Sequence, residues 1–594
     1  MKASSYQKNP GPTDKGVNLM QPEENEIKRI EEAKQKWEDG ALKQAMQRLG
    51  LQESPLEIYT PADLKDHDYL EQTGFPGEYP FTAGRFAVPL VSAMWGRGKN
   101  LGAGKMIKTS FGYSGYGTAE DMREFYLEKG NRRGAGPNIA FDLPTQIGYD
   151  SDDELAEGEV GRVGVAIDTL KDFETLYEAW TNDQDLDKIA SNWTINGTTN
   201  ILLAMYIALA EKRGIAQEKL RGTPQNDILK EFVARGTHLF PAKPSMRMTR
   251  DTFTYCAEHM PAMNTVSISG FHMREAGATR VQAVAFTFAN AIAYFQLAID
   301  AGLDVDVFAK QVTFLNFGGG MEVLKEAACR RAARRVWAKI MRDRFHAKKP
   351  ANWIYRELGG GLAGYWPCTK QRPLNNLVRV AIGAVFAAMI GDPPGMEPPF
   401  DEPLGLGHSI EARQLGADAA RIIVEECKLG DVHDALGGSY YIESLTDMYE
   451  KEMFELIRKI DEMGGAIEAI GSGWMKMEII GSAATFQQGV EKGEIIRVGV
   501  NKYTEPDEID VMVPRTSPYK AERREDAEQR QIESLQKIRK QRDNKRVQDC
   551  LVKIENAARD EQANLIPLFV EAVKEYTTMG EICRVLRNVF GEAK

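Results

Sequence analysis

The sequence predicts an α/β fold built on a (β/α)8 TIM barrel, with an N-terminal helical arm and a C-terminal helical tail. Three observations support this prediction. At 594 residues the chain is too long for one ordinary domain. Between about residues 110 and 440, short apolar runs alternate with longer amphipathic stretches. Strands that alternate with helices need crossover connections, so the sheet should be parallel and covered by helices. The span and the number of alternations suit a barrel better than a doubly wound sheet, although periodicity alone separates the two poorly.

The elements follow in chain order. Residues 1–75 are expected to form the arm, with helical spacing in 22–50, and residues 76–445 the barrel. The expected strands are the short apolar runs at 137–143, 191–196, 264–270 and 311–317. The expected helices lie at 168–181, 199–213, 278–301 and 322–343.

Two inserts and two C-terminal regions complete the prediction. Residues 89–106 are rich in Gly and basic residues and 391–403 in Pro, so both should be loops. Residues 446–504 should be helical and pack on the barrel. Residues 505–594 are highly charged and should form long helices, with apolar faces in LIPLFVEAVKEY and ICRVLRNVF.

Composition excludes several classes of protein. A net charge of −11 argues against a general nucleic-acid surface. We expect no membrane span, because we find no run of about eighteen uncharged apolar residues, and a cytoplasmic location, because the first residues lack an apolar signal core. The six cysteines lie far apart without a CxxC pair, so we expect reduced, mostly buried thiols and no metal site. Neither a phosphate-binding loop nor a dinucleotide fingerprint is present.

Polar residues gather where two strands end. In GTPQNDILKEFVARGT (222–237), Gln225 and Asn226 are expected at a helix start and Arg235 well inside the helix or just past it. In SISGFHMREAGATR (267–280), His272 is expected just before a helix that begins near Glu275. Polar groups at the mouth of a barrel would suit a small-molecule site. A lone histidine after a strand is, however, more often a structural residue.

Ten segments taken together resemble the large subunit of the methylmalonyl-CoA mutase family, in the expected order from about residue 22 to the C-terminus. They are YPFTAGR (79–85), GYSGYGTAED (112–121), IAFDLPTQIGYDSD (139–152), EGEVGRVGVAID (157–168), TPQNDILKEF (223–232), PSMR (244–247), SISGFHMREAGAT (267–279), RAARRVWAKIM (331–341), LGGSYYIESLTD (436–447) and VGVNKY (498–503).

The resemblance implies a barrel whose axis holds the pantetheine arm of an acyl-CoA, with adenosylcobalamin at the C-terminal face of the strands. It also implies a radical rearrangement of the carbon skeleton, for which the cofactor supplies the reactivity. His433 lies in DVHDALGG, close to the cobalt-binding DxHxxG loop, but Gly437 falls one residue late. We therefore expect a separate small cobalamin-binding subunit in a heterodimer or heterotetramer. The charged tail is a candidate docking element, or else an arm wrapped around its own barrel.

The resemblance also implies roles for single residues. Tyr113 matches a tyrosine between substrate and corrin, Arg235 an arginine that pairs with the free carboxylate of the substrate, and His272 a histidine that hydrogen-bonds the thioester carbonyl. Gln225 matches a glutamine beside the substrate. The carboxylates that hold the adenosine ribose match Glu275 and Glu402.

The sequence departs from the family pattern around the expected site. Phe271 replaces a tyrosine, and glycines around Gly360 replace a His and a Gln near the adenosyl group. Gln311 and Thr313 stand in a strand that carries an arginine in relatives, so Lys108 and Arg97 on the insertion are candidates to bind CoA phosphate.

These departures enlarge the expected pocket and make it less polar, with Phe271, Met396 and Phe400 as apolar lining. The sequence thus favours a mutase for a carboxylated acyl-CoA of methylmalonyl/succinyl type, with a bulky alkyl or aryl branch as one option. Plain methylmalonyl-CoA is the other. A non-catalytic barrel that binds CoA esters is the alternative from another class.

Overall fold

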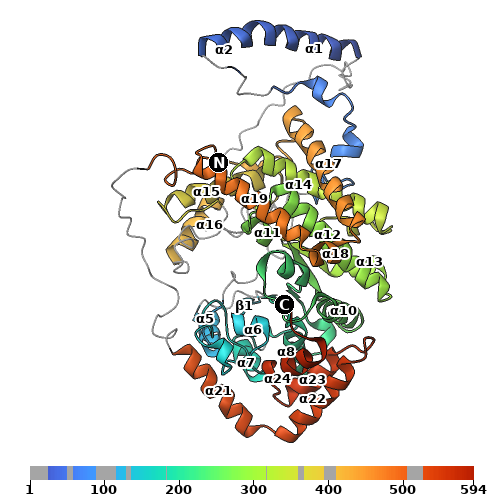
Figure 1. Ribbon diagram of the computed structural model, residues 1–594, viewed down its shortest axis with the longest axis vertical. Coiled ribbons are helices and arrows are strands. Elements are labelled where there is room, and N and C mark those ends of the chain that lie inside the picture. The colour runs from blue at the N-terminus through green and yellow to red at the C-terminus, as the bar shows by residue number, and fades with distance from the viewer. Residues whose placement is uncertain are drawn as a thin grey trace, which may run out of the picture. The chain divides into compact units, whose positions relative to one another are not determined.

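The computed structural model describes residues 24–49, 52, 58–87, 115–128, 136–181, 184–315, 318–358, 367–392, 410–504 and 526–593. The chain divides into two compact units, one formed by Met1–Asp68 with Gly438–Ser444 and the other by Tyr69–Gly437 with Leu445–Lys594. The first unit contains α1 (Glu24–Trp37) and α2 (Lys43–Leu49), joined by one π-helical turn (Figure 1). The helix predicted over 22–50 is therefore confirmed.

Among the described residues of the second unit, six short strands form two three-stranded sheets. Their pairing within β1–β2–β3 and within β4–β5–β6 is parallel throughout. The strands are β1 (Asn138–Ala140), β2 (Ser191–Thr194), β3 (Gly222–Pro224), β4 (Val266–Ser269), β5 (Val312–Leu315) and β6 (Glu357–Leu358). Four of them confirm the predicted strands. We did not predict β3 and β6, which at three and two residues are too short to show periodicity.

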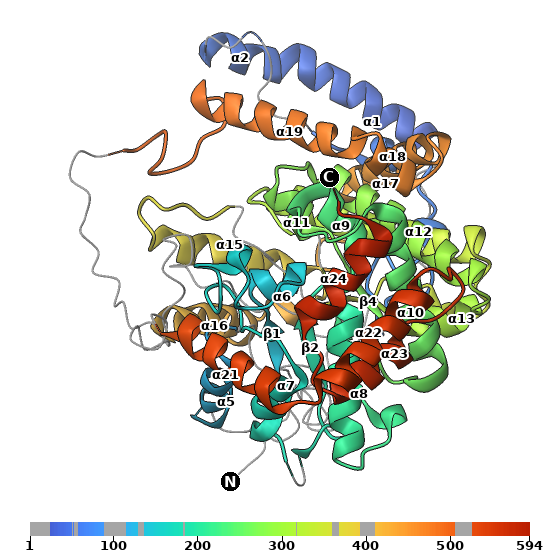
Figure 2. The same ribbon diagram turned by 60° about the horizontal axis from the view of Figure 1, so that its bottom comes forward.

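Backbone hydrogen bonds also join the β3 segment to the β4 segment, so the strands lie side by side in chain order. The amide of Asn264 donates to the carbonyl of Gly222 at 2.9 Å, and that of Ser267 to Gln225 at 2.9 Å. Helices cross between successive strands, as predicted for a parallel sheet. They are α8 (Thr199–Lys212), α10 (Ala242–His259), α12 (Arg280–Asp300) and α14 (Val323–Lys339) (Figure 2). The described residues thus show an α/β fold with sequential parallel strands, and they do not show a closed ring.

The two faces of the sheet differ in chemistry. On the helix-covered face, the Trp193 ring lies 5.0 Å from Tyr206 of α8, and the Phe314 ring 4.8 Å from Trp337 of α14. Because side chains alternate along a strand, their neighbours face the other way. This opposite face, which we call the polar face, carries Asn192, Thr194, Thr223, Ser267 and Thr313.

Helix α12 contains a long uncharged stretch of the kind that we did not find in the sequence. Residues 281–299 carry no charge, and among the described helices α12 alone is long and apolar enough to cross a membrane. However, 78% of its apolar window is buried inside the protein. The helix is apolar because it packs in the core against α10 and α14.

The predicted C-terminal helices are present as α21 (Ala527–Gln541), α22 (Asn544–Ala558), α23 (Ile566–Lys574) and α24 (Met579–Phe590). Helix α23 lies along α8 (Figure 2). Ile566, Phe569 and Leu586 are fully buried in the same hydrophobic core as Trp193 and Tyr206. The apolar faces predicted in the tail are therefore covered by this chain itself. Before the tail, α17 (Tyr440–Glu462), α18 (Ala466–Gly471) and α19 (Trp474–Glu491) make the expected helical region 446–504 helical as far as Glu491.

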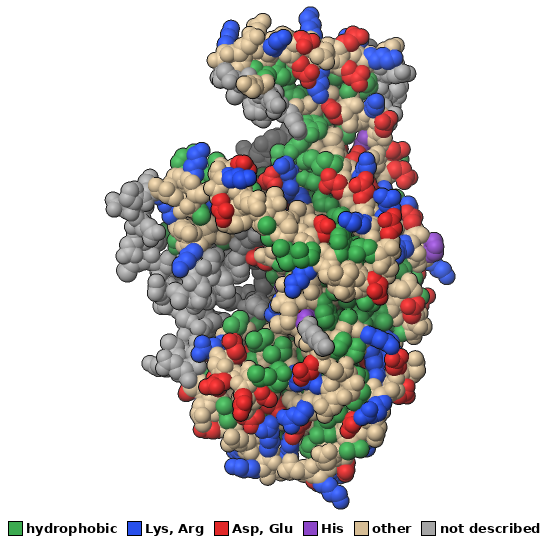
Figure 3. Space-filling model, viewed as in Figure 1, with side chains coloured by type: hydrophobic (Ala, Val, Ile, Leu, Met, Phe, Trp, Pro, Cys, Tyr) green, Lys and Arg blue, Asp and Glu red, His purple; other side chains and the backbone are tan. Residues whose placement is uncertain are grey.

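The surface charge and the burial of the cysteines can be compared with what the composition predicts. On the face drawn in Figure 3, basic and acidic side chains are interspersed, without a basic region that dominates it. Five of the six cysteines are buried, and Cys427 is exposed. Within the described ranges, no group of three or more His, Cys, Asp and Glu is arranged to hold a metal ion.

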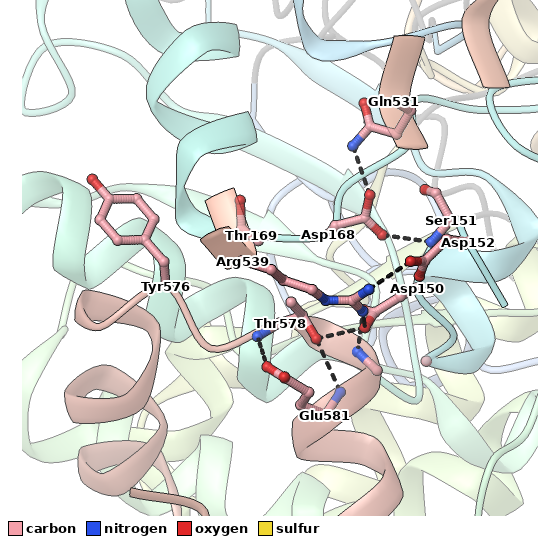
Figure 4. Close-up of polar contacts among 12 residues, drawn as sticks. Asp150, Ser151, Asp152, Asp168, Thr169, Gln531, Arg539, Tyr576, Thr578 and Glu581 are labelled. Carbon is pink, nitrogen blue, oxygen red and sulfur yellow. Dashed lines mark hydrogen bonds and ion pairs between the residues drawn. The ribbon is translucent and has the colours of Figure 1, made fainter. Parts of the chain in front are cut away.

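A buried acidic cluster ties the tail to the loops after the first strands (Figure 4). Asp150 accepts hydrogen bonds from Arg539 Nη2, Thr578 Oγ1 and the Gly580 amide, each at 2.6 Å. Gln531 Nε2 donates to Asp168 at 2.8 Å and to Asp172 at 3.1 Å. The tail is thus held to these loops by directional polar contacts as well as by apolar packing.

Candidate functional site

The segment after β3 brings Gln225 and Arg235 to the C-terminal edge of the sheet. Gln225 continues the ladder, because its amide donates to the Trp193 carbonyl at 2.9 Å, and the Asn226 amide donates to Ile195 at 2.8 Å. These two residues follow the last residue of β3 and directly precede a helix, close to the helix start at which we expected them. The helix begins with α9 (Ile228–Lys230) and continues as a π-helix from Glu231 to Arg235. It ends at Gly236, whose positive φ of 85° suits glycine.

The segment after β4 places His272 on a short helix, α11 (Phe271–Glu275). We had expected His272 before the helix and Glu275 at its start, whereas Glu275 is its last residue. A helix of five residues is too short to show periodicity in sequence. The segments after β3 and β4 are joined through Asp227, which accepts hydrogen bonds from the Ser269 amide and from Tyr294 Oη, both at 2.8 Å.

A buried polar network surrounds the Gln225 side chain. Lys230 Nζ donates to Gln225 Oε1 at 2.6 Å and to Glu231 Oε1 at 2.7 Å. Asn196 Nδ2 reaches the same two oxygens at 3.1 and 2.6 Å. The side chains of Lys230 and Glu231 are both fully buried. Burial would raise the pKa of Glu231, but Lys230 and Arg235 hold this pKa below its ordinary value. Burial also lowers the pKa of Lys230, and several hydrogen bonds offset the desolvation of the pair.

His272 is held as a neutral imidazole beside this network. Its Nδ1 lies 2.8 Å from Ser269 Oγ, and its ring centroid lies 3.8 Å from that of Phe271. Burial and the positive charges of Lys230 and Arg235 lower the pKa of His272 well below its ordinary value. In the tautomer in which Ser269 Oγ donates to Nδ1, the imidazole carries its proton on Nε2 and can donate from there.

Arg235 offers a guanidinium at the open side of the network. Its side chain is 28% exposed, and among the described residues its charged group has one partner, Glu231 Oε1 at 3.4 Å. Because this contact is long and uses one nitrogen, other N–H groups of Arg235 are directed elsewhere and can bind an oxyanion. Glu275 adds an exposed carboxylate at the end of α11.

Comparison with known proteins identifies the family of this site. The model of the methylmalonyl-CoA mutase family matches residues 50–592, which is most of the chain. The chain belongs to the methylmalonyl-CoA mutase family. Mutases are isomerases, and the protein is accordingly an isomerase of this family.

Three relatives show the range of the family. The 2-hydroxyisobutanoyl-CoA mutase large subunit of Aquincola tertiaricarbonis is 38% identical over 533 residues, 90% of each chain. Methylmalonyl-CoA mutase of Escherichia coli is 39% identical over 539 residues, covering 90% of this chain and 70% of that enzyme. Human mitochondrial methylmalonyl-CoA mutase is 37% identical over 526 residues, 87% of this chain and 66% of the human one. The chain thus spans about two thirds of the mitochondrial enzyme.

The structure does not bring all the predicted site residues of this mutase-family chain together. Gln225, Arg235, Phe271, His272 and Glu275 lie at the ends of β3 and β4 or on the short helices that follow. Thr313 lies on the polar face, with its hydroxyl donating to the Val266 carbonyl at 3.3 Å. The side chain of Gln311 instead contacts the end of α10, donating to the Met260 carbonyl at 3.3 Å. Outside the described residues lie Tyr113, Glu402, Gly360, Lys108, Arg97 and most of both inserts.

Sequence reasoning missed the residues that support the site. Asn196, Lys230 and Glu231 were not singled out, although they make the central hydrogen bonds. One signal was present in the family segment TPQNDILKEF, where charged residues stand among apolar ones directly after a strand. Asn196 gave no such signal, because its role depends on contacts across the sheet.

Proposed function

We propose that this chain is the large subunit of an adenosylcobalamin-dependent acyl-CoA mutase that rearranges a carboxylated acyl-CoA of methylmalonyl/succinyl type. The observation that carries the proposal is Arg235, a half-buried guanidinium that makes one long contact with Glu231 and stands beside the neutral His272. A planar guanidinium can bind a carboxylate through two hydrogen bonds, which favours acids over neutral acyl groups.

His272 and Gln225 would bind the thioester end of the substrate. The imidazole N–H can donate to the thioester carbonyl, where negative charge grows as the group migrates. A neutral imidazole can donate this hydrogen bond and keep its proton, so the thioester oxygen is not protonated. Gln225 supplies a second polar group from the end of β3. The substrate would thus be held at its carboxylate by Arg235 and at its thioester by His272 and Gln225.

The described residues fit an adenosyl group at the same edge of the sheet. The exposed carboxylate of Glu275 is suited to accept hydrogen bonds from ribose hydroxyls. When bound, adenosylcobalamin supplies a deoxyadenosyl radical by homolysis of its cobalt–carbon bond. The residues of this chain would hold the substrate beside it, and Phe271 would help to exclude water.

We further propose that the sequential parallel strands close into a (β/α)8 barrel and that the pantetheine arm of CoA lies along its axis. The polar face supports this arrangement, since Thr223, Ser267 and Thr313 carry short hydroxyl side chains. Side chains of this kind leave room and can hydrogen-bond amides of the pantetheine arm.

We propose a separate small cobalamin-binding chain as the partner. The Aquincola relative is named a large subunit, and it aligns with this chain over 90% of both lengths. This similarity supports the proposal. This partner would contribute the lower ligand of cobalt.

The proposal is tested with the purified complex, adenosylcobalamin and a panel of methylmalonyl-CoA, benzylmalonyl-CoA and 2-hydroxyisobutyryl-CoA. We expect turnover of the two dicarboxylic esters and a cob(II)alamin signal in the absorption spectrum on their addition. Arg235→Met should lower kcat/KM for them about 100-fold, since a charged hydrogen bond is lost, and Arg235→Lys should lose less.

Three outcomes would contradict parts of the proposal. Faster turnover of 2-hydroxyisobutyryl-CoA, with no effect of Arg235→Met, would exclude carboxylate recognition by Arg235. Faster turnover of methylmalonyl-CoA than of benzylmalonyl-CoA would exclude the enlarged pocket. No cob(II)alamin signal with any ester would favour the non-catalytic barrel.

A further inference from the structure

We propose that Lys230 and Asn196 are positioning residues that hold the side-chain amide of Gln225 with its NH2 group toward the substrate. This inference rests on the proposed function, because it concerns how the acyl-CoA site is built. Both residues act through the oxygen of Gln225.

The chemistry of Lys230 decides which end of the Gln225 amide faces inward. A lysine ammonium has three donors and no acceptor, so the Gln225 atom 2.6 Å from Nζ must be the oxygen. A flipped amide would put two donors against each other at that distance. Lys230 is itself held, because Nζ also donates to Glu231 Oε1 at 2.7 Å inside a fully buried pair.

Asn196 supplies the second donor to the same oxygen, at 3.1 Å. Its own orientation is fixed from two sides. Its Oδ1 accepts from the Asp227 amide at 2.9 Å, and its Nδ2 donates to Glu231 at 2.6 Å. Since a backbone amide can only donate, Asn196 cannot flip without breaking this contact. Both donors to Gln225 Oε1 are therefore locked.

The orientation leaves the donors of Gln225 free for a ligand. Gln225 follows Thr223 on the polar face, and its Nε2 has no hydrogen-bond partner in the described ranges, although the residue is only 6% exposed. A carboxylate or a thioester carbonyl presents only acceptors, so it matches this NH2 group. The opposite orientation would set the amide oxygen against a substrate oxygen and weaken binding.

The test measures binding of succinyl-CoA and methylmalonyl-CoA to the full chain by titration calorimetry, without cofactor. Lys230→Met and Lys230→Gln form a matched pair, because both remove the buried cation and only glutamine keeps a donor for Gln225 Oε1. We expect Gln225→Ala and Lys230→Met each to weaken binding about tenfold, and Lys230→Gln to stay within about threefold of the wild type. In the Gln225→Ala background, Lys230→Met should weaken binding no further.

Equal losses in Lys230→Met and Lys230→Gln would overturn the inference, as would losses that add to that of Gln225→Ala, since both results indicate a general structural role. If Lys230→Met does not fold, Asn196→Leu carries the same comparison with the ion pair intact. It should weaken binding in the wild type and not in the Gln225→Ala chain. Failure of the wild type to bind either ester would instead overturn the proposed function.

Discussion

At the scale of single residues, the surroundings of Asp168 disfavour the ionised form of its carboxyl group. It is buried, and its oxygens accept hydrogen bonds from the Ser151 amide and from Gln531 Nε2, both at 2.8 Å (Figure 4). Burial, together with the nearby carboxylates of Asp150 and Asp172, raises the pKa of Asp168 well above its ordinary value. The folded protein therefore binds a proton here more tightly than the unfolded chain does.

This shift predicts a pH dependence of stability. Between the unfolded pKa, about 4, and the raised folded pKa, the native state holds more protons than the unfolded state, so the contribution of Asp168 to stability falls as pH rises. Asp168→Asn removes this titration. We expect the variant to gain in melting temperature relative to the wild type as pH rises from 5 to 8, measured by thermal unfolding at each pH. A difference that is constant across this range would contradict the shifted pKa.

At the scale of elements, Arg247 of α10 completes the C-terminal end of α22. The last carbonyls of a helix lack partners within the helix and need donors from elsewhere. Arg247 Nη2 donates to the carbonyls of Ala557 at 3.1 Å, Asp560 at 2.6 Å and Ala563 at 3.1 Å, and Nη1 donates to Ala558. One guanidinium thus joins the turn between α22 and α23 to α10 by hydrogen bonds.

Replacing Arg247 should loosen the tail selectively. We expect Arg247→Met to lower the free energy of unfolding by about 2–3 kcal/mol, because several buried carbonyls lose their donor. Amide hydrogen exchange should increase most in α22 and α23, as measured by mass spectrometry. Arg250→Met is the matched control, since Arg250 on the same helix pairs with the Asp251 side chain at 2.8 Å. Equal exchange in the two variants would show that Arg247 does not fasten the tail.

Elements also differ in how well the sequence predicted them. Helices α8, α12 and α14 have 14 to 21 residues, and β2, β4 and β5 have apolar runs bounded by polar residues. Such lengths show their periodicity, so these elements were predicted. The helix expected after Gln225 and Asn226 is present as α9 and the π-helical turn that follows it. The three-residue β3 was not predicted, and the five-residue α11 begins earlier than the helix expected near Glu275. They are fixed by hydrogen bonds across the sheet, such as that from Ser269 to Asp227.

At the scale of the whole molecule, the tail helices share one hydrophobic core with β2 and α8. Phe569 of α23 is fully buried in one hydrophobic cluster with Trp193 and Tyr206. A residue shared in this way couples the stability of the two regions.

Phe569→Ala should therefore destabilise the tail together with the strands and helices that share its core. We expect a loss of about 3–4 kcal/mol from the cavity that forms. Tryptophan fluorescence and far-ultraviolet circular dichroism should report one shared transition at lower denaturant concentration. Val552→Ala, at a 47% exposed position on α22, is the control and should change stability little. Separate transitions in Phe569→Ala would indicate that the tail unfolds independently.

The sequence by itself determined the alternation of strands and helices, the helical arm and tail, and, through family resemblance, Arg235, His272 and Gln225 at one site. These features depend on local periodicity or on motifs that lie within one segment. Only the tertiary structure decided that Lys230 and Asn196 orient Gln225, that Gln311 contacts α10 and that the apolar tail is covered by α8. The physical reason is that hydrogen bonds and packing join residues distant in sequence, such as Asn196 and Glu231, and no local pattern encodes which donor meets which acceptor.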